Sequence, residues 1–92
     1  MLTRDIIVES QHGLHMRVAT RIAEISKEHG ATVSLINPDN RRANGHSVLD
    51  MLTLGAQRGT RLRMIVEGPT EADVVSQLTE ILATGGSVEP VI

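Results

Sequence analysis

The chain has 92 residues and a formal net charge of −2, and 40% of its residues are hydrophobic. This length suits one small domain, and the absence of cysteine excludes disulfides, thiolate chemistry and cysteine-based zinc sites. Because there is no phenylalanine, tyrosine or tryptophan, the core must be aliphatic. The missing stacking side chains and the negative net charge both argue against binding of nucleic acid.

The N-terminal part of the chain predicts a strand, a helix and a second strand. Residues 2–9 indicate a strand in which Leu2, Ile6 and Val8 share one face, with Arg4 as the exception. Apolar residues at helical spacing indicate an amphipathic helix over 16–29, with Gly30 as its stop. The alternation resumes over 31–36 and indicates the second strand.

The middle of the chain predicts a turn, a short return strand and a short helix. The cluster Asn37-Pro38-Asp39-Asn40 is typical of a turn, and residues 41–43 follow it as a short strand. Ser47 begins a Ser-x-x-Asp capping pattern, which predicts the start of a helix. Gly55 follows soon afterwards, so this helix is short.

The last predicted elements are a strand and a longer helix. Residues 60–67 alternate between apolar and charged side chains, which indicates a half-buried strand. Thr70 and Asp73 occupy capping positions before an amphipathic stripe, and Gly85-Gly86 ends the helix. The buried stripe is expected to contain Val74, Leu78, Ile81 and Leu82.

The resulting order, β-α-β-β-α-β-α, together with one-sided strands and amphipathic helices, indicates an α+β fold with helices on one face of a small sheet. We expect a single domain over 1–92, with an ordered core over about 2–84 and a loose C-terminal tail over 85–92. No apolar run approaches the roughly 20 residues of a membrane span, and the N-terminus has no signal-peptide core. A cytoplasmic monomer that binds neither membrane nor nucleic acid is therefore expected.

The segment Gly13-Leu14-His15-Met16-Arg17 places a histidine at the N-terminus of the first predicted helix. That end of a helix carries unpaired N–H groups and a partial positive charge, so it disfavours the imidazolium and favours an anion made on the ring. The cation of Arg17 is unfavourable there unless an anion is expected. These features predict a nucleophilic His15 with Arg17 as a phosphate-stabilising side chain.

The same segment resembles the active-site loop of the HPr family, the histidine-containing phosphocarrier proteins of the bacterial sugar phosphotransferase system. A second segment, His46 to Gly55, is similar to the family's regulatory-serine helix, and Arg58-Gly59-Thr60 and Glu67-Gly68 also follow its pattern. The resemblance covers nearly the whole chain in order. It implies an open-faced sandwich in which three helices lie on one face of a four-stranded antiparallel sheet.

The resemblance also implies a role for each residue of the first motif. His15 would accept a phosphoryl group on Nδ1 from phosphohistidine enzyme I, which draws it from phosphoenolpyruvate, and pass it to a histidine of an enzyme IIA-type protein. The backbone of Met16 and Arg17 would contact the phosphoryl group. The chain would then be a phosphocarrier rather than an enzyme and would need no cofactor, in sugar transport or in a regulatory relay.

The short helix at Ser47 adds a regulatory site and a docking surface. By resemblance, Ser47 is phosphorylated by HPr kinase/phosphorylase in organisms that have this enzyme. The helix is too short to bury all its apolar side chains, so we expect Val48 and Leu52 to point inward and Leu49 and Met51 to lie partly outward. The partner-docking residues assigned here are Arg21, Val48, Leu49, Met51 and Leu52.

Two departures from the family pattern and one alternative function remain. Val18 stands where the family usually has proline, and His46 stands where many relatives have lysine or arginine. The main alternative function is a non-catalytic HPr-like module that only binds a protein partner. The four histidines are scattered, with no carboxylate cluster nearby, so no metal site is expected. His12 is three residues from His15 and could act with it, but the spacing across a glycine-containing loop does not fix the geometry, so we expect His12 to be a surface residue.

Overall fold

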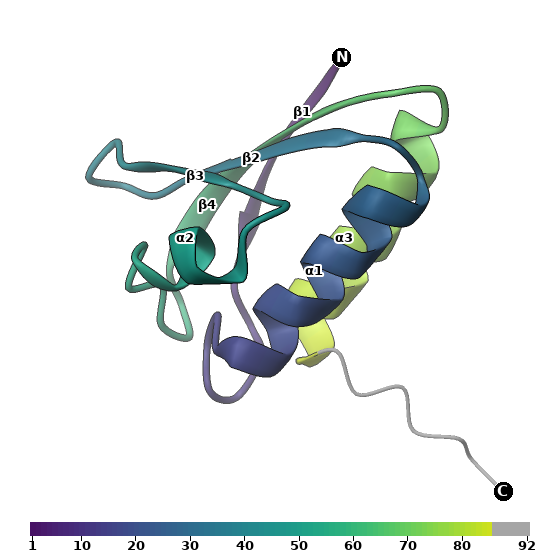
Figure 1. Cartoon of the computed structure of the whole chain (residues 1–92). Helices are drawn as coiled ribbons and strands as arrows, with labels where there is room; N and C mark the ends of the chain where they lie inside the picture. Colours follow the sequence, from purple (N-terminus) through teal and green to yellow (C-terminus); the bar gives the residue numbers. More distant parts are fainter. Residues whose placement is uncertain (86–92) are drawn as a thin grey trace, which may run out of the picture.

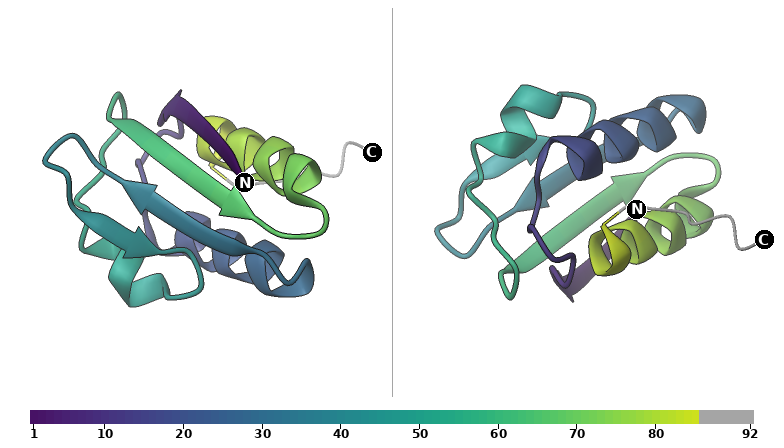
Figure 2. Two further views of the ribbon diagram at one scale, coloured as in Figure 1. Left: turned by 90° about the horizontal axis from the view of Figure 1, so that it is seen from above. Right: turned by 90° about the horizontal axis from the view of Figure 1, so that it is seen from below.

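Four antiparallel strands form one sheet in the order β1-β4-β2-β3, and three helices lie on one of its faces (Figures 1 and 2). The computed structural model describes residues 1–85. The elements in chain order are β1 (Leu2–Ile7), α1 (Met16–Glu28), β2 (Thr32–Ile36), β3 (Arg42–Asn44), α2 (Val48–Leu52), β4 (Arg61–Glu67) and α3 (Glu71–Thr84). The predicted fold class and element order are confirmed, whereas the predicted loose tail lies, apart from Gly85, outside the described residues.

The core fills the space between the sheet and the helices with aliphatic side chains only. The alternation predicted for β4 places Leu62, Met64 and Val66 on the buried face. They meet the buried side chains of α1, such as Ile22, and those of α3, such as Leu78. Burial of apolar surface stabilises the fold by about 25 cal/mol per Å², and this free energy holds α1 and α3 on this face of the sheet.

Helix α1 ends as Gly30 predicts. Gly30 has a φ of +61°, its N–H donates to the carbonyl of Lys27 at 3.1 Å, and the N–H of Ala31 donates to the carbonyl of Ser26 at 2.9 Å. This pair of hydrogen bonds is the Schellman motif, which satisfies the last carbonyls of the helix. The chain then turns directly into β2.

The start of α3 differs from the sequence prediction. Thr70 is the N-cap residue, but its side chain makes no capping hydrogen bond. Instead, Thr70 Oγ1 is hydrogen-bonded to His29 Nδ1 at 2.8 Å, and His29 Nε2 lies 3.3 Å from the side-chain amide of Gln77. The threonine thus ties the start of α3 to the end of α1, and the acidic residues Glu71 and Asp73 in its first turn still complement the helix dipole.

The first strand is shorter than predicted and lies at an edge of the sheet. It ends at Ile7 rather than at residue 9, and the Val8 N–H then donates to the loop carbonyl of Thr60 at 2.8 Å. Leu2 pairs with Val66 at this edge and keeps 40% of its surface exposed, whereas Ile6 and Val8, which share its predicted face, are buried.

An ion pair on the uncovered face of the sheet predicts a measurable pH dependence. Arg63 Nε donates to Asp5 Oδ1 at 3.0 Å across β1 and β4, and this hydrogen bond holds the pKa of the Asp5 carboxyl below its usual value. A lowered folded-state pKa contributes stability above the unfolded-state pKa of about 4, and that contribution disappears as the pH falls through the folded-state value.

Asp5→Asn should therefore reduce the loss of stability that acid causes. We expect the free energy of unfolding, measured with urea from pH 7 to pH 2.5, to fall less steeply below about pH 4 than in the unchanged chain. Asp39→Asn is the matched control, because Asp39 is an exposed turn residue that forms no ion pair within residues 1–85. If the free energy of unfolding fell equally steeply with pH in the unchanged chain and in Asp5→Asn, the ion pair would not contribute to acid sensitivity.

Helix α2 begins at Ser47, as predicted. Ser47 Oγ accepts the Asp50 N–H at 3.1 Å. The Asp50 carboxylate does not complete a reciprocal capping box, because its Oδ2 accepts the Asn44 N–H at 2.7 Å. This link fixes the end of β3 to the first turn of α2.

Loss of the Ser47 cap should weaken the fold modestly. Ser47→Ala removes the acceptor of the Asp50 N–H, and we expect the free energy of unfolding to drop by about 1 kcal/mol in chemical denaturation. Ser47→Asp keeps a capping oxygen and should retain most of the stability. Equal destabilisation by the two substitutions would show that the cap is not what Ser47 contributes.

Candidate functional site

His15 is the N-cap residue of α1, which confirms its predicted position. Its backbone is extended, with φ −96° and ψ −178°, and its carbonyl accepts the Ala19 N–H at 2.9 Å. Its ring turns back over the helix end, so that Nδ1 accepts the Arg17 N–H at 3.2 Å. Because an accepting ring nitrogen carries no proton, Nδ1 has a lone pair and Nε2 carries the hydrogen in the neutral ring.

The loop before His15 is fixed by hydrogen bonds from two distant parts of the chain. Ser10 is buried, its N–H donates to the Leu82 carbonyl of α3 at 3.0 Å, and its Oγ donates to the Gly13 carbonyl at 2.8 Å. The Leu14 N–H donates to the carbonyl of Ala56 at 2.9 Å. These contacts hold the loop in one shape, so His15 presents Nδ1 with little freedom.

Ser10 and Ala56 are positioning residues that the sequence does not reveal. A serine in a loop that also contains a glycine is typical of a turn, but nothing local identifies Leu82 as the acceptor of its N–H. Ala56 contributes only a backbone carbonyl, so its residue type does not indicate that it contacts the His15 loop.

The electrostatic surroundings of His15 favour an anion. The first turn of α1 contains no acidic residue. Arg17 is exposed and forms no ion pair within residues 1–85, and the Met16 N–H has no acceptor in that same stretch. A helix end with unpaired N–H groups and an unpaired guanidinium attracts phosphate or carboxylate.

His12 lies beside His15, a proximity that the three-residue spacing across a glycine-containing loop does not determine. It is exposed, as expected, and the two ring centroids are 5.9 Å apart in an edge-to-face arrangement. No group of three or more histidine, aspartate or glutamate side chains within residues 1–85 is arranged to bind a metal ion.

The prediction for the apolar face of α2 is right for Leu49 and wrong for Met51. Leu49 is 76% exposed, whereas Met51, expected to lie partly outward, is 0% exposed and belongs to the core. Val48 and Leu52 are partly buried against the same core. The reason is helical spacing: Val48, Met51 and Leu52 lie at i, i+3 and i+4 and share one face, and Leu49 is on the other.

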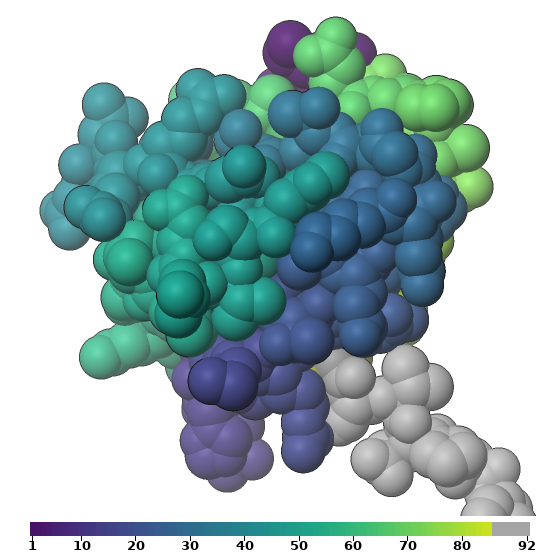
Figure 3. Space-filling view, viewed as in Figure 1, coloured from purple at the N-terminus to yellow at the C-terminus, as the bar shows by residue number. Residues whose placement is uncertain are grey.

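Helices α1 and α2 pack against each other, and each carries one large exposed apolar side chain. We call the surface defined by Met16, which is 63% exposed, Arg17 and Leu49 the docking surface. Figure 3 shows α2 and the loop before α1 together on one side of the molecule. Arg21, also assigned to docking, is half-buried and donates to Glu24 at 3.2 Å, so its charge is partly neutralised. Met51 cannot contribute to this surface.

The ring of His46, which stands where many relatives have lysine or arginine, makes a structural hydrogen bond. Its Nε2 is hydrogen-bonded to the carbonyl of Ala31 at 2.6 Å, and its N–H donates to Asn44 Oδ1 at 2.9 Å. The ring thereby ties the entrance of α2 to the start of β2.

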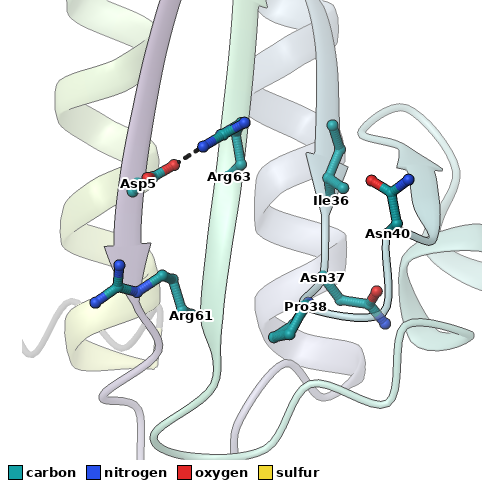
Figure 4. Close-up of a pocket in the computed structure, with 7 residues that line it drawn as sticks. All are labelled: Asp5, Ile36, Asn37, Pro38, Asn40, Arg61 and Arg63. Carbon is teal, nitrogen blue, oxygen red and sulfur yellow. Dashed lines mark hydrogen bonds and ion pairs between the residues drawn. The ribbon is translucent and has the colours of Figure 1, made fainter.

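A groove of about 250 Å³ lies away from His15, on the uncovered face of the sheet (Figure 4). Its lining residues are Asp5, Ile36, Asn37, Pro38, Asn40, Arg61 and Arg63. Arg63 is paired with Asp5 there, and none of these residues belongs to the His15 loop. The candidate site is therefore an open surface around one histidine, an arrangement that suits exchange between proteins better than capture of a small molecule.

Comparison with known families gives a match over nearly the whole chain. The family described as "PTS HPr component phosphorylation site" matches residues 2–84. The phosphocarrier protein HPr of Borreliella burgdorferi is 28% identical over 82 residues, which cover 89% of this chain and 94% of that protein. The multiphosphoryl transfer protein of Salmonella typhimurium is also 28% identical, over 87 residues and 92% of this chain, but the chain spans only 23% of its length.

Solved structures agree in fold. HPr-C-His from Thermoanaerobacter tengcongensis superimposes with a TM-score of 0.84 at 21% identity, covering 97% of this chain and 99% of that one. A phosphocarrier protein HPr from Bacillus anthracis gives a TM-score of 0.79 at 18% identity, covering 86% and 93%. No helix within residues 1–85 is both long enough and apolar enough to cross a membrane.

Proposed function

Because the chain belongs to the HPr family of phosphotransferase-system phosphocarriers, we propose that His15 carries a phosphoryl group between two proteins. The donor is phosphohistidine enzyme I, charged by phosphoenolpyruvate, and the acceptor is a histidine of an enzyme IIA-type protein. The chain acts as a cytoplasmic monomer. Sugar transport and a regulatory relay use the same chemistry at His15, so the proposal covers both.

The observation that carries this proposal is the hydrogen bond from the Arg17 N–H to His15 Nδ1 at 3.2 Å. It keeps a proton off Nδ1 and points its lone pair to the electropositive end of α1. In the transfer, that lone pair forms the new N–P bond while the N–P bond of the donor breaks. The electron pair of the broken bond returns to the donor ring, and the Nε2–H of His15 stays in place.

The surroundings of His15 suit a carrier, which must also release the phosphoryl group. The exposed guanidinium of Arg17 and the Met16 N–H are available to the phosphoryl oxygens. Charge-assisted hydrogen bonds contribute about 1.5–3 kcal/mol each. His15 is partly exposed and its neighbours Met16 and Arg17 are exposed, so a phosphoryl group on Nδ1 stays accessible to an acceptor protein.

Phosphorylation by enzyme I tests the proposal. The protein is incubated with purified enzyme I and ³²P-labelled phosphoenolpyruvate, and acid-labile, alkali-stable label should appear on the chain, as expected for phosphohistidine. Addition of a IIA-type protein should then move the label to that protein. A chain that takes up no label, or that never passes it on, would refute the carrier role.

The docking surface should contribute to the transfer rate without contributing to the fold. Leu49 is exposed in the first turn of α2, so Leu49→Asp places an acidic residue where a helix tolerates it. Loss of an exposed apolar anchor at an interface costs about 2 kcal/mol, and we expect kcat/KM for transfer from enzyme I to fall about 30-fold. Steady-state transfer assays measure this.

Leu2→Asp is the matched control for Leu49→Asp. Leu2 is also an exposed leucine, but it lies at the β1 edge of the sheet. Leu2→Asp should leave kcat/KM within about threefold of the value for the unchanged chain, which corresponds to a free-energy change of less than about 1 kcal/mol. Equal losses in both variants would show that exposed apolar surface in general, not the docking surface, governs the rate.

Regulation at Ser47 stays a prediction. Ser47 is half-buried and its Oγ caps α2. A phosphate at that N-cap would be tolerated by the helix end and would place negative charge next to Leu49. We therefore propose that an HPr kinase, where the host has one, would slow transfer by modifying Ser47.

A further inference from the structure

The first turn of α1 contains a buried amide without an acceptor. Val18 is the third residue of the helix, and its exposed fraction is 0%. In the described chain, residues 1–85, its N–H donates to no backbone or side-chain acceptor. Its neighbours are satisfied, because the Arg17 N–H donates to His15 Nδ1 and the Ala19 N–H donates to the His15 carbonyl. Water does not reach Val18, so an unpaired N–H here is costly.

The His15 ring is held at this end of the helix, because its Nδ1 accepts the Arg17 N–H at 3.2 Å. An N-cap side chain approaches the N–H groups of the second and third helical residues, which here are Arg17 and Val18. Nδ1 has one lone pair, and Arg17 takes it. A phosphoryl group in the same place would bring three acceptor oxygens and negative charge, enough for both amides.

We propose that the Val18 N–H binds the phosphoryl group on His15, an inference that rests on the carrier function proposed above. When the Nδ1 lone pair forms the N–P bond, the Arg17 N–H loses its acceptor. Both amides then donate to phosphoryl oxygens, while the buried Val18 side chain anchors this turn in the core. The unphosphorylated chain bears an unpaired buried donor and the phosphorylated chain does not, so this amide shifts the equilibrium toward phosphohistidine.

Two substitutions separate the amide from the side chain. Val18→Pro deletes the N–H, and proline is tolerated in the first turn because the helix itself does not use that donor. Val18→Ala keeps the N–H and removes most of the side chain. We expect Val18→Pro to shift the equilibrium partition of the phosphoryl group between enzyme I and the carrier about tenfold toward enzyme I, and Val18→Ala to shift it less than threefold.

A second measurement uses the unchanged chain and does not depend on how the variants fold. The ¹⁵N-labelled protein is phosphorylated with phosphoramidate, a small-molecule phosphoryl donor, and its amide spectrum is compared before and after. The Val18 amide proton should move downfield, as it does when a donor gains a charged acceptor. The shift should reverse when the phosphoryl group is hydrolysed.

The outcomes distinguish this inference from the carrier function. If His15 is phosphorylated, the Val18 amide does not move and Val18→Pro partitions like Val18→Ala, then the inference is overturned and the carrier function stands. If neither enzyme I nor phosphoramidate places phosphate on His15, both fail. If Val18→Pro does not fold, the amide shift in the unchanged chain decides.

Discussion

Replacement of His15 by alanine should abolish phosphorylation by enzyme I, to below the limit of detection. Nδ1 of His15 is the nitrogen with its lone pair directed to the electropositive end of α1 by the Arg17 N–H. The nearest alternative acceptor is His12, whose ring centroid is 5.9 Å away but which is not at the N-cap. A transfer that depends on helix-end donors cannot move to that ring without losing them.

Two controls make the His15 result specific. His15→Asn keeps a side-chain acceptor at the N-cap and should fold with nearly unchanged stability, whereas His15→Ala should lose about 1 kcal/mol. Neither variant should form phosphohistidine. This result would show that phosphorylation requires the imidazole and that loss of the capping hydrogen bond is not what abolishes it. His12→Ala should still be labelled, with a rate within about threefold of the unchanged chain, under 1 kcal/mol. Label that persists in His15→Ala would identify a different acceptor.

The same variants decide between a carrier and a module that only binds a partner. A binding module would keep its function in His15→Ala and lose it in Leu49→Asp. A carrier loses transfer in the first variant and is slowed in the second. Measurement of partner binding and phosphoryl transfer in both variants separates these functions.

Gly13→Ala is the substitution with the largest expected effect on the fold near the site. Gly13 has a φ of +71°, and a Cβ built there would lie 2.6 Å from the Ala56 carbonyl oxygen and 2.8 Å from Cα of Gln57. Both obstacles are backbone atoms, so no flexible side chain can move aside. Left-handed strain of about 1–2 kcal/mol and overpacking of about 1–3 kcal/mol add to a loss of about 3 kcal/mol in the free energy of unfolding.

Gly55→Ala is the control that separates strain from collision. Gly55 has a similar φ of +62°, but no heavy atom lies within 4 Å of the Cβ position. We expect it to cost only about 1 kcal/mol in urea unfolding. Gly13→Ala should also slow phosphorylation, because the loop moves away from Ala56 and carries His15 with it. Equal destabilisation by the two substitutions would contradict the close contact between the loops.

The parts of the fold that sequence predicts are those specified by local periodicity. The buried face of β4 follows from its alternation, and the end of α1 follows from Gly30. His15 as N-cap is equally local, because the helical spacing begins directly after it. In each case the determining residues are within one turn or strand of the feature.

The errors arise from contacts between residues far apart in the chain. Thr70 is the N-cap residue of α3, but its hydroxyl is hydrogen-bonded to His29, 41 positions earlier, and makes no capping hydrogen bond. Leu2 is exposed because β1 lies at the edge of the sheet, which alternation alone does not indicate. The fixed shape of the His15 loop depends on backbone contacts to Ala56 and Leu82, and side-chain identity carries no record of those.

The wrong prediction for Met51 has a different origin, because the spacing of residues within α2 itself indicates that Met51 is buried. In a five-residue helix the spacing of Val48, Met51 and Leu52 already puts these three on one face. A helix that packs by that face leaves only Leu49 outward. Helix geometry, rather than the number of apolar residues, therefore determines what a partner would contact.

Ring-nitrogen NMR of the phosphorylated protein tests most directly whether the phosphoryl group is carried on Nδ1 of His15. The chain is labelled with ¹⁵N-histidine, phosphorylated by enzyme I, and examined for coupling between ³¹P and each imidazole nitrogen. We expect coupling to Nδ1 of His15. Coupling to Nε2 of that ring, or to a nitrogen of His12, His29 or His46, would contradict it.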